Sequence, residues 1–423
     1  MTNLSFFKNV ATLATGTLLA QALPILFSPI LTRLYEPEAF GVFALYMAIV
    51  SSVTPAISGK YEVAQVLPQR RVDALHLFVI AIYVTVLLSF LFLIIFLSLH
   101  DQIIKFFDIE KLSGWILFVP FSLLMVGFLN TFSYYTNRKK EYNVLAKSKV
   151  IQSISAIFTQ LLFGILNAGF IGLLIASMIS SAIATLYLLK RYIHDFTTKI
   201  FCLSSRKKAL LKEYADFPAY NASTGLLNGL SVSAPVFFLS FYYPESMVGY
   251  FALVQRVAMA PLGFISVAVS QVNLKSVVDL VNHGQCVECY LYKVSGILLL
   301  ITFFPFVILT IYAPELFSLV FGEKWFMAGQ FAQIIIPSIA IRFVASTLSS
   351  TLGATKNNKV GAIWKIVYFV STFLVLSIYA PEGDINMTLK AFVINEIALY
   401  ILYYVAILYA AKNPNNVITT RTV

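Results

Sequence analysis

Charged residues are scarce in this sequence. Asp, Glu, Lys and Arg make up 12% of its 423 residues, whereas 59% are hydrophobic and the mean hydropathy is +0.83. Soluble domains carry about a quarter of their residues as charged side chains, which cover the surface that faces water. The composition therefore excludes a soluble globular protein and predicts an integral membrane protein.

Other absences exclude particular chemistries. The segment from His283 to Cys289 resembles a metal or redox motif, but no second ligand pair lies near it, so we expect no metal site and no cofactor. The sequence contains no G-x-x-x-x-G-K-[ST] phosphate loop, which argues against a nucleotide-driven pump. The three cysteines are Cys202, Cys286 and Cys289. All three fall on the side that the basic residues, described below, assign to the cytoplasm, so we expect no disulfide.

The most prominent feature of the sequence is a series of long apolar runs. About 20 residues span a hydrocarbon core of about 30 Å, and continuous runs of this length favour helices over membrane strands. Twelve runs meet this length, six in each half, and predict an all-α fold of about twelve transmembrane helices. They are Val10–Ile30, Phe40–Ser58, Leu75–Leu99, Trp115–Tyr134, Val150–Leu166, Phe170–Leu189, Pro218–Phe241, Met247–Val269, Tyr290–Ala313, Phe331–Leu352, Val360–Ala380 and Ile385–Tyr409.

The basic residues predict the orientation. We assign the amino terminus and the loops after the even-numbered runs to one side of the membrane. That side then receives most of the Lys and Arg residues, and the opposite side receives only Arg33, Lys105, Lys111, Lys324 and Lys390. By the positive-inside rule both termini are cytoplasmic. The net charge of +11 is then explained by topology and by anionic membrane lipids, so we expect no nucleic-acid partner.

A short sequence pattern occurs twice. Gly41-Val-Phe-Ala-Leu45 returns 208 residues later as Gly249-Tyr-Phe-Ala-Leu253, and Tyr35 returns as Tyr243. The repeat predicts two six-helix lobes related by duplication, residues 1–200 and 201–412, followed by a cytoplasmic tail, residues 413–423. The polar stretch from Lys190 to Asp216 is interpreted as a linker with a short amphipathic helix.

Prolines and buried charges mark candidate functional positions. Pro24 and Pro29 in the first run, and Pro218 and Pro235 in the seventh, predict interrupted helices that could act as gates. Membrane-depth charges are costly and usually face a polar interior. The deep charges are Arg256, Arg342, Lys60, Glu62 and Glu396.

These deep charges leave two interpretations open. In the first, Lys60, Arg256 and Arg342 bind an anionic, phosphorylated substrate, while Glu62 and Glu396 bind a coupling ion. In the second, the charges form structural ion pairs, for example Arg342 with Glu396. If the second helix continues through Pro68, Lys60 and Glu62 would lie on different faces and could not pair.

Four segments carry a family resemblance: Leu31–Leu45, Ser58–Ala64, Val66–Pro68 and the turn Tyr135–Lys140. They resemble bacterial polysaccharide-export flippases of the multidrug/oligosaccharidyl-lipid/polysaccharide (MOP) exporter superfamily. The resemblance implies a V-shaped, MATE-like fold around a cationic cavity in the bacterial inner membrane. It also implies that an undecaprenyl-diphosphate-linked oligosaccharide, destined for O-antigen, lipopolysaccharide, capsule or exopolysaccharide, is moved to the outer leaflet. Membrane lipids and downstream polymerase and chain-length proteins would be its partners.

Other functions remain as alternatives. A multidrug or metabolite exporter of the same superfamily would share the fold, although a carrier of cationic drugs should place acids in its pocket, and the run Val10–Ile30 has none. A membrane polymerase or glycosyltransferase would need a large extramembrane loop. Because the outward loops are short, we expect a transporter and not an enzyme.

Overall fold

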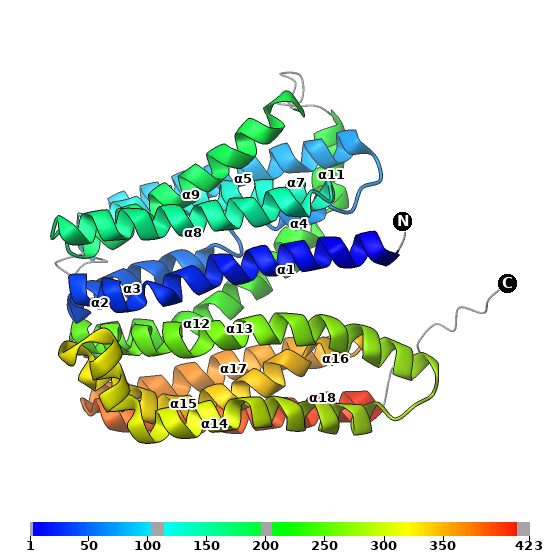
Figure 1. Ribbon diagram of the computed structural model, residues 1–423. Coiled ribbons are helices and arrows are strands. Elements are labelled where there is room, and N and C mark those ends of the chain that lie inside the picture. Colours follow the sequence, from blue (N-terminus) through cyan, green and yellow to red (C-terminus); the bar gives the residue numbers. More distant parts are fainter. Residues whose placement is uncertain (1–2, 103–113, 196–204, 413–423) are drawn as a thin grey trace. The chain divides into compact units, whose positions relative to one another are not determined.

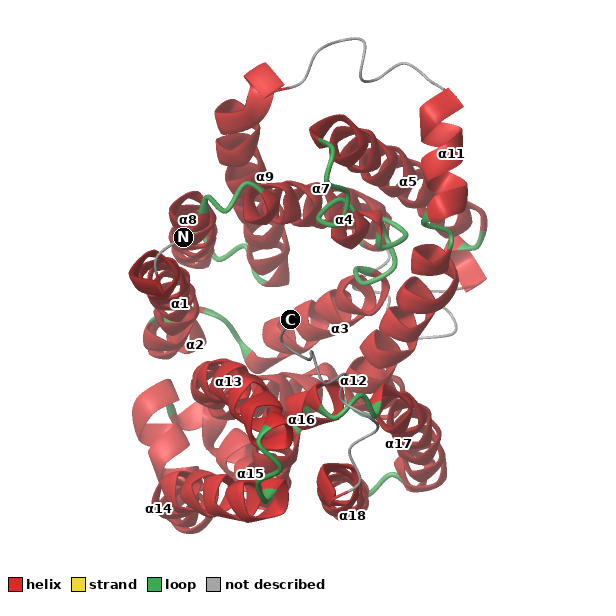
Figure 2. Cartoon of the chain, turned by 90° about the vertical axis from the view of Figure 1, so that its right-hand side faces the viewer, coloured by secondary structure: helices red, strands yellow, loops and turns green. Residues whose placement is uncertain are grey.

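The computed structural model describes residues 3–102, 114–195 and 205–412. Within these ranges the regular structure is helical throughout and no strand occurs, as Figures 1 and 2 show. Ten helices are long and apolar enough to cross a membrane, Pro37–Val53 is a shorter apolar helix, and Glu245–Asn282 runs for 38 residues. Each of the twelve predicted runs overlaps helices, which confirms the all-helical fold, although the run Phe40–Ser58 extends past the end of α3 at Val53.

Figure 1 shows the helices in chain order, coloured from blue to red. Their bounds are α1 (Asn3–Leu26), α2 (Ser28–Leu34), α3 (Pro37–Val53), α4 (Tyr61–Ala64), α5 (Arg71–Ser98), α7 (Val119–Arg138), α8 (Tyr142–Ile165), α9 (Phe170–Tyr192), α11 (Ser205–Glu213), α12 (Ser223–Tyr242), α13 (Glu245–Asn282), α14 (Val287–Phe321), α15 (Phe326–Leu348), α16 (Ser350–Ala354), α17 (Asn358–Tyr379) and α18 (Ile385–Lys412).

Contacts divide the chain into two compact units, Met1–Gly249 and Tyr250–Val423. This boundary reflects packing, so it does not test the predicted duplication boundary at residue 200. In the first unit α8 packs against α1 and α9, α7 against α5 and α9, and α3 against α12. Buried side chains such as Val42, Tyr46 and Leu123 form its core, and the Tyr46 hydroxyl shares a 2.7 Å hydrogen bond with Ser122.

The second unit has its own core. There α14 packs on α15, and α18 packs on both α15 and α17. Trp325 and Phe331 are fully buried, and the Tyr250 ring meets both edge-on at centroid distances of 5.9 and 6.0 Å. Many apolar side chains outside the cores are exposed, for example Leu319 at 76% and Ile394 at 67%. Such surfaces suit a protein whose solvent is lipid.

The first predicted helix is interrupted between α1 and α2, whereas α12 continues through Pro235. Pro24 lies inside α1, which ends at Leu26, and Pro29 occupies the first turn of α2. The Ser28 hydroxyl donates to the Pro24 carbonyl oxygen at 2.7 Å, one turn back. Pro218 lies in the first turn of a short π-helix, Phe217–Ala222, and Pro235 lies inside α12.

The repeated sequence adopts the same local structure twice. Tyr35 ends α2 with an extended backbone and donates its N–H to Leu31, and Tyr243 ends α12 in the same way, donating to Leu239. The next helix in each case begins two residues later, α3 at Pro37 and α13 at Glu245. The 208-residue offset therefore relates helix ends as well as residue types.

The expected linker helix is present as α11. Arg206 makes two 2.8 Å hydrogen bonds to the carboxylate of Asp73 at the start of α5, and these bonds raise the pKa of Arg206. Lys207 and Leu210 are buried on the same helix, while Lys208 is exposed, so α11 is amphipathic. The predicted tail, residues 413–423, lies outside the described residues, as do Lys105, Lys111 and Cys202.

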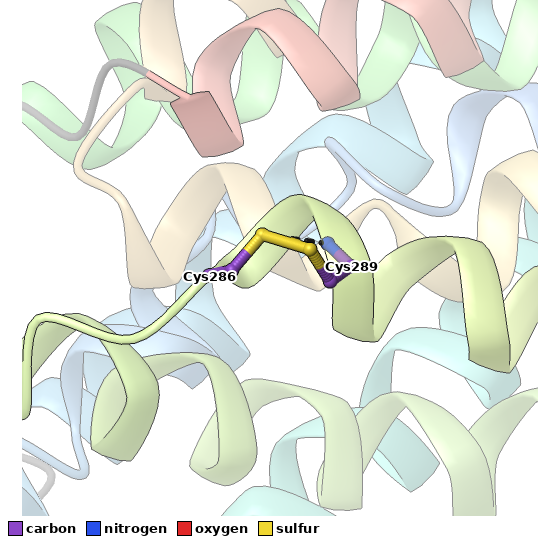
Figure 3. Close-up of a disulfide and its surroundings, with 2 residues drawn as sticks. All are labelled: Cys286 and Cys289. Carbon is purple, nitrogen blue, oxygen red and sulfur yellow. Dashed lines mark hydrogen bonds between the residues drawn. A yellow bond between two sulfur atoms is a disulfide. The ribbon is translucent and has the colours of Figure 1, made fainter.

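The expectation that no disulfide forms is wrong for one pair. Figure 3 shows the disulfide between Cys286 and Cys289 at the start of α14. Cys286 caps the helix, its sulfur accepts from the Cys289 N–H at 3.2 Å, and their Cα atoms lie 5.5 Å apart. A cap residue and the third helical residue share one turn, so their side chains meet, which spacing alone did not show.

Candidate functional site

The helix that carries Lys60 is broken, not continuous. After α3 ends at Val53 the chain turns at Pro55, which has no N–H to continue the helix, and two consecutive residues, Gly59 and Lys60, adopt left-handed conformations with φ near 60°. Glycine takes this conformation freely, whereas lysine adopts it at a cost. The break places Lys60 at the start of the four-residue helix α4.

This turn brings Lys60 and Glu62 together. Lys60 Nζ lies 3.8 Å from Glu62 Oε1, and the Ser58 hydroxyl donates a short hydrogen bond to the other carboxylate oxygen. The expectation that these two charges could not pair is therefore wrong, because it assumed helical spacing through residue 60. The Glu62 side chain is 4% exposed and that of Lys60 is 23% exposed, so the amine is the more accessible of the two.

Helix α12 lies against this turn. A Cβ added to Gly225 would lie 3.5 Å from Lys60 Cε and 3.0 Å from Pro55 Cβ. One turn further along, Gly229 is so close to α3 that the Ser52 hydroxyl donates to its carbonyl oxygen at 3.4 Å. Helix α12, which contains Pro235, thus packs directly beside Lys60.

A second charged pair lies in the other unit, between α15 and α18. Arg342 Nη1 is 3.7 Å from Glu396 Oε2, and the Tyr368 hydroxyl donates a short hydrogen bond to Glu396 Oε1. The Glu396 side chain is 2% exposed and that of Arg342 is 20% exposed. The ion pair considered as an alternative from the sequence is therefore present in the structure.

Aromatic rings surround this pair. The Arg342 guanidinium lies over the Tyr400 ring, 5.8 Å from its centroid. Trp364 stacks on Tyr403 at 4.1 Å and on Tyr368 at 5.1 Å. These rings form a largely apolar wall along α17 and α18, in which a charge interacts more strongly than it would in water.

The two pairs share one arrangement. Each carboxylate takes its close hydrogen bond from a neutral hydroxyl, whereas each cation stays beyond hydrogen-bond distance of the acid, at 3.7–3.8 Å. Within the described residues, the Lys60 amine and the Arg342 guanidinium make no hydrogen bond. Their donors are thus available to an anionic ligand.

Arg256, the third predicted cation, lies on α13 and is half-buried. It belongs to the second unit, as do Arg342 and Glu396. The structure brings Lys60 to Glu62 and Arg342 to Glu396; it does not place Arg256 in either pair. The role of Arg256 in substrate binding stays a prediction.

Sequence reasoning missed two polar residues with long-range contacts. It treated Arg138 only as a topological charge, yet this side chain donates to the carbonyl oxygens of Gln65, Val66 and Pro68. Asn273 is fully buried, and its side-chain amide nitrogen donates to the hydroxyls of Ser350 and Thr351. Its side-chain oxygen Oδ1 has no hydrogen-bond partner among the described residues. A signal existed for Arg138, because it lies in the Tyr135–Lys140 segment.

No group of three or more His, Cys, Asp or Glu side chains in the described residues could hold a metal ion. The helices and their paired charges define a polytopic membrane protein with the fold of MOP-superfamily transporters. An inward-facing multidrug resistance MATE family transporter of the MOP superfamily matches with a TM-score of 0.66 and 16% identity, over 96% of this chain and 95% of that one. The lipid II flippase MurJ, in an inward closed conformation, matches with a TM-score of 0.64 and 18% identity, over 97% of this chain and 86% of that one.

Sequence comparison identifies the family. Residues 30–329 match the family described as polysaccharide biosynthesis protein, and the chain belongs to that family. A relative from Klebsiella pneumoniae, described as an uncharacterized membrane protein in the cps region, is 21% identical over 373 residues, which cover 87% of this chain and 75% of the relative.

Proposed function

We propose that this protein is a flippase that moves an undecaprenyl-diphosphate-linked oligosaccharide repeat unit from the cytoplasmic to the outer leaflet of the bacterial inner membrane. Two findings support the general part of this proposal, that the protein is a membrane transporter in polysaccharide biosynthesis. The family is one of polysaccharide biosynthesis, and the fold is shared with membrane transporters, including a lipid flippase. The repeat unit would serve O-antigen, lipopolysaccharide, capsule or exopolysaccharide assembly.

The observation that supports the proposal most directly is that the donors of two cationic side chains, Lys60 and Arg342, are not used in hydrogen bonds among the described residues. Both side chains are largely buried. A diphosphate offers several acceptor oxygens and negative charge, and Arg can bind it through two donors at once. Binding of a diphosphate would satisfy donors that the protein leaves open.

The acids suit a coupling role in this mechanism. Glu62 and Glu396 each lie beside a cation and accept from a neutral hydroxyl. Without substrate each acid balances the charge of its own cation, Glu62 that of Lys60 and Glu396 that of Arg342. A diphosphate bound at either cation would be repelled by the neighbouring acid unless that acid is protonated. Proton or cation binding at Glu62 and Glu396 would therefore favour substrate binding and link transport to an ion gradient.

We further propose that the protein works by alternating access, with both termini in the cytoplasm. The prolines Pro24, Pro29, Pro218 and Pro235 mark the candidate gates, because a helix bends more easily where proline removes a backbone hydrogen bond. The protein would not be an enzyme. It would hand its product to polymerase and chain-length proteins, and membrane lipids would surround the undecaprenyl tail.

Deletion of the gene tests the proposal. Lipid-linked oligosaccharides are extracted from the deletion strain and measured by mass spectrometry, with the upstream glycosyltransferases intact and the surface polymer measured in parallel. Accumulation of one complete repeat unit on undecaprenyl diphosphate, with loss of polymer and recovery on complementation, is the expected result. Normal repeat-unit and polymer levels would exclude it and favour the alternative, export of drugs or metabolites.

A further inference from the structure

Arg138 makes an unusual set of contacts at the end of α7. Its Nη1 donates to the carbonyl oxygens of Gln65 and Val66, both at 3.0 Å, and its Nη2 donates to the carbonyl oxygen of Pro68 at 2.6 Å. These carbonyls follow the last turn of α4. Within the described residues, no backbone N–H donates to any of the three.

The carbonyls that Arg138 bonds belong to the segment that follows α4, where a backbone carbonyl without a backbone donor needs a partner from elsewhere. Helix α4 has only four residues, too few to be stable alone. A guanidinium carries five N–H donors in a rigid plane, so one Arg side chain can bond several carbonyls at once. Arg138 thus holds the segment that follows α4 from a helix about seventy residues away.

A second contact runs between the same two helices. The Gln65 side-chain amide donates to the Thr131 carbonyl oxygen on α7 at 2.9 Å, and Gln65 is fully buried. On its other side α4 packs Tyr61 and Ala64 into a core cluster with Leu77 of α5. The hydrogen bonds from α7 and the packing on α5 together hold α4 in one place.

We propose that Arg138 is a positioning residue for Lys60. Lys60 precedes α4 directly in the left-handed conformation, so a shift of α4 moves its amine with it. By bonding the segment that directly follows α4, Arg138 fixes where the Lys60 amine is offered to the substrate diphosphate. The proposal rests on the proposed function, and it gives a physical role to the Tyr135–Lys140 segment.

The first test uses transport in cells. Arg138→Ala, Arg138→Lys and Lys60→Gln are compared in the lipid-linked oligosaccharide assay, at matched protein levels. Loss of positioning should lower transport roughly tenfold or more in Arg138→Ala. Arg138→Lys should recover part of the activity, because lysine keeps the charge and some of the donors. Arg191→Ala, which removes an exposed ion pair with Glu141, is the matched control and should transport normally.

A double variant separates positioning from general stability. If Arg138 acts through Lys60, the variant Arg138→Ala with Lys60→Gln should be no worse than Lys60→Gln alone. Additive losses in that double variant would overturn the proposal, because they would show that Arg138 acts on transport independently of Lys60.

A labelling measurement decides the matter without any substrate. Lys60→Cys is made after Cys202, Cys286 and Cys289 are changed to Ser, and its reaction rate with a small methanethiosulfonate is measured in membranes. Adding Arg138→Ala should change this rate several-fold, whereas a cysteine at the exposed position Lys190 should react unchanged. An unaltered rate at position 60 would contradict the proposal. If gene deletion left repeat-unit levels normal, the flippase function would fail, but the labelling result would still decide whether Arg138 positions residue 60.

Discussion

Gly41 and Gly249 occupy equivalent positions in the repeated sequence and lie against each other in the first unit. A Cβ added to Gly41 would lie 3.1 Å from the Gly249 amide nitrogen and would collide with the carbonyl oxygen of Glu245. A Cβ added to Gly249 would lie 3.2 Å from the Gly41 nitrogen and would collide with the carbonyl oxygen of Pro37. Since Pro37 and Glu245 are also 208 residues apart, the contact is symmetric about the repeat.

Alanine at either glycine should therefore destabilise the protein. Neither neighbour is a flexible side chain, so the backbones must separate, and overpacking of this kind costs about 1–3 kcal/mol. Gly41→Ala and Gly249→Ala should both lower the melting temperature of the purified protein. Gly296→Ala is the control, because a Cβ there meets nothing within 4 Å. Equal melting temperatures for all three variants would contradict the close contact.

Transport should depend on the positive charge of Lys60 more than on the shape of its side chain. A hydrogen bond to a charged group contributes about 1.5–3 kcal/mol, roughly ten- to a hundredfold in rate or affinity. Lys60→Gln should therefore accumulate lipid-linked repeat unit, whereas Lys60→Arg should remain active. Lys190→Gln, on an exposed lysine, is the control. Normal polymer in the Lys60→Gln strain would remove Lys60 from the substrate site.

The Arg342–Glu396 pair allows stability and transport to be separated. Loss of one partner of a fully buried pair costs about 3–5 kcal/mol, and less here because Arg342 is 20% exposed. Glu396→Leu alone should lower the melting temperature, and adding Arg342→Met should restore much of it, because no charge is left unpaired. Transport should stay absent in the double variant. Recovery of transport together with stability would show that the pair is only structural.

Helix α11 should detach from α5 when its ionic contact is removed. Arg206 holds Asp73 through two hydrogen bonds, and its own side chain is 47% exposed, so salt should screen the contact. Arg206→Gln should speed hydrogen exchange in residues 205–213, and high salt should do the same to the wild-type protein. Lys208→Gln, at an exposed position on the same helix, should exchange normally. Identical exchange in both variants would contradict a role for this contact.

The helices were predictable because each membrane crossing requires a long apolar run, and this requirement is local in sequence. The break after α3 was not predicted, because Pro55 is compatible with a membrane helix and nothing near Lys60 requires a left-handed residue. The contact between Arg138 and the residues that follow α4 joins segments about seventy residues apart, which spacing does not reveal. The Arg342–Glu396 pair was anticipated as one of two interpretations, because buried charges need partners.

The most direct test of the central claim uses purified protein in proteoliposomes. An undecaprenyl-diphosphate-linked repeat unit is incorporated, and a membrane-impermeant glycosidase is added outside to cleave sugars in the outer leaflet. The wild-type protein should make the inner-leaflet pool accessible over time, and the variant Lys60→Gln with Arg342→Gln should leave it protected, as in protein-free vesicles. Equal protection with and without the wild-type protein would contradict the account of this protein as a lipid-linked oligosaccharide flippase.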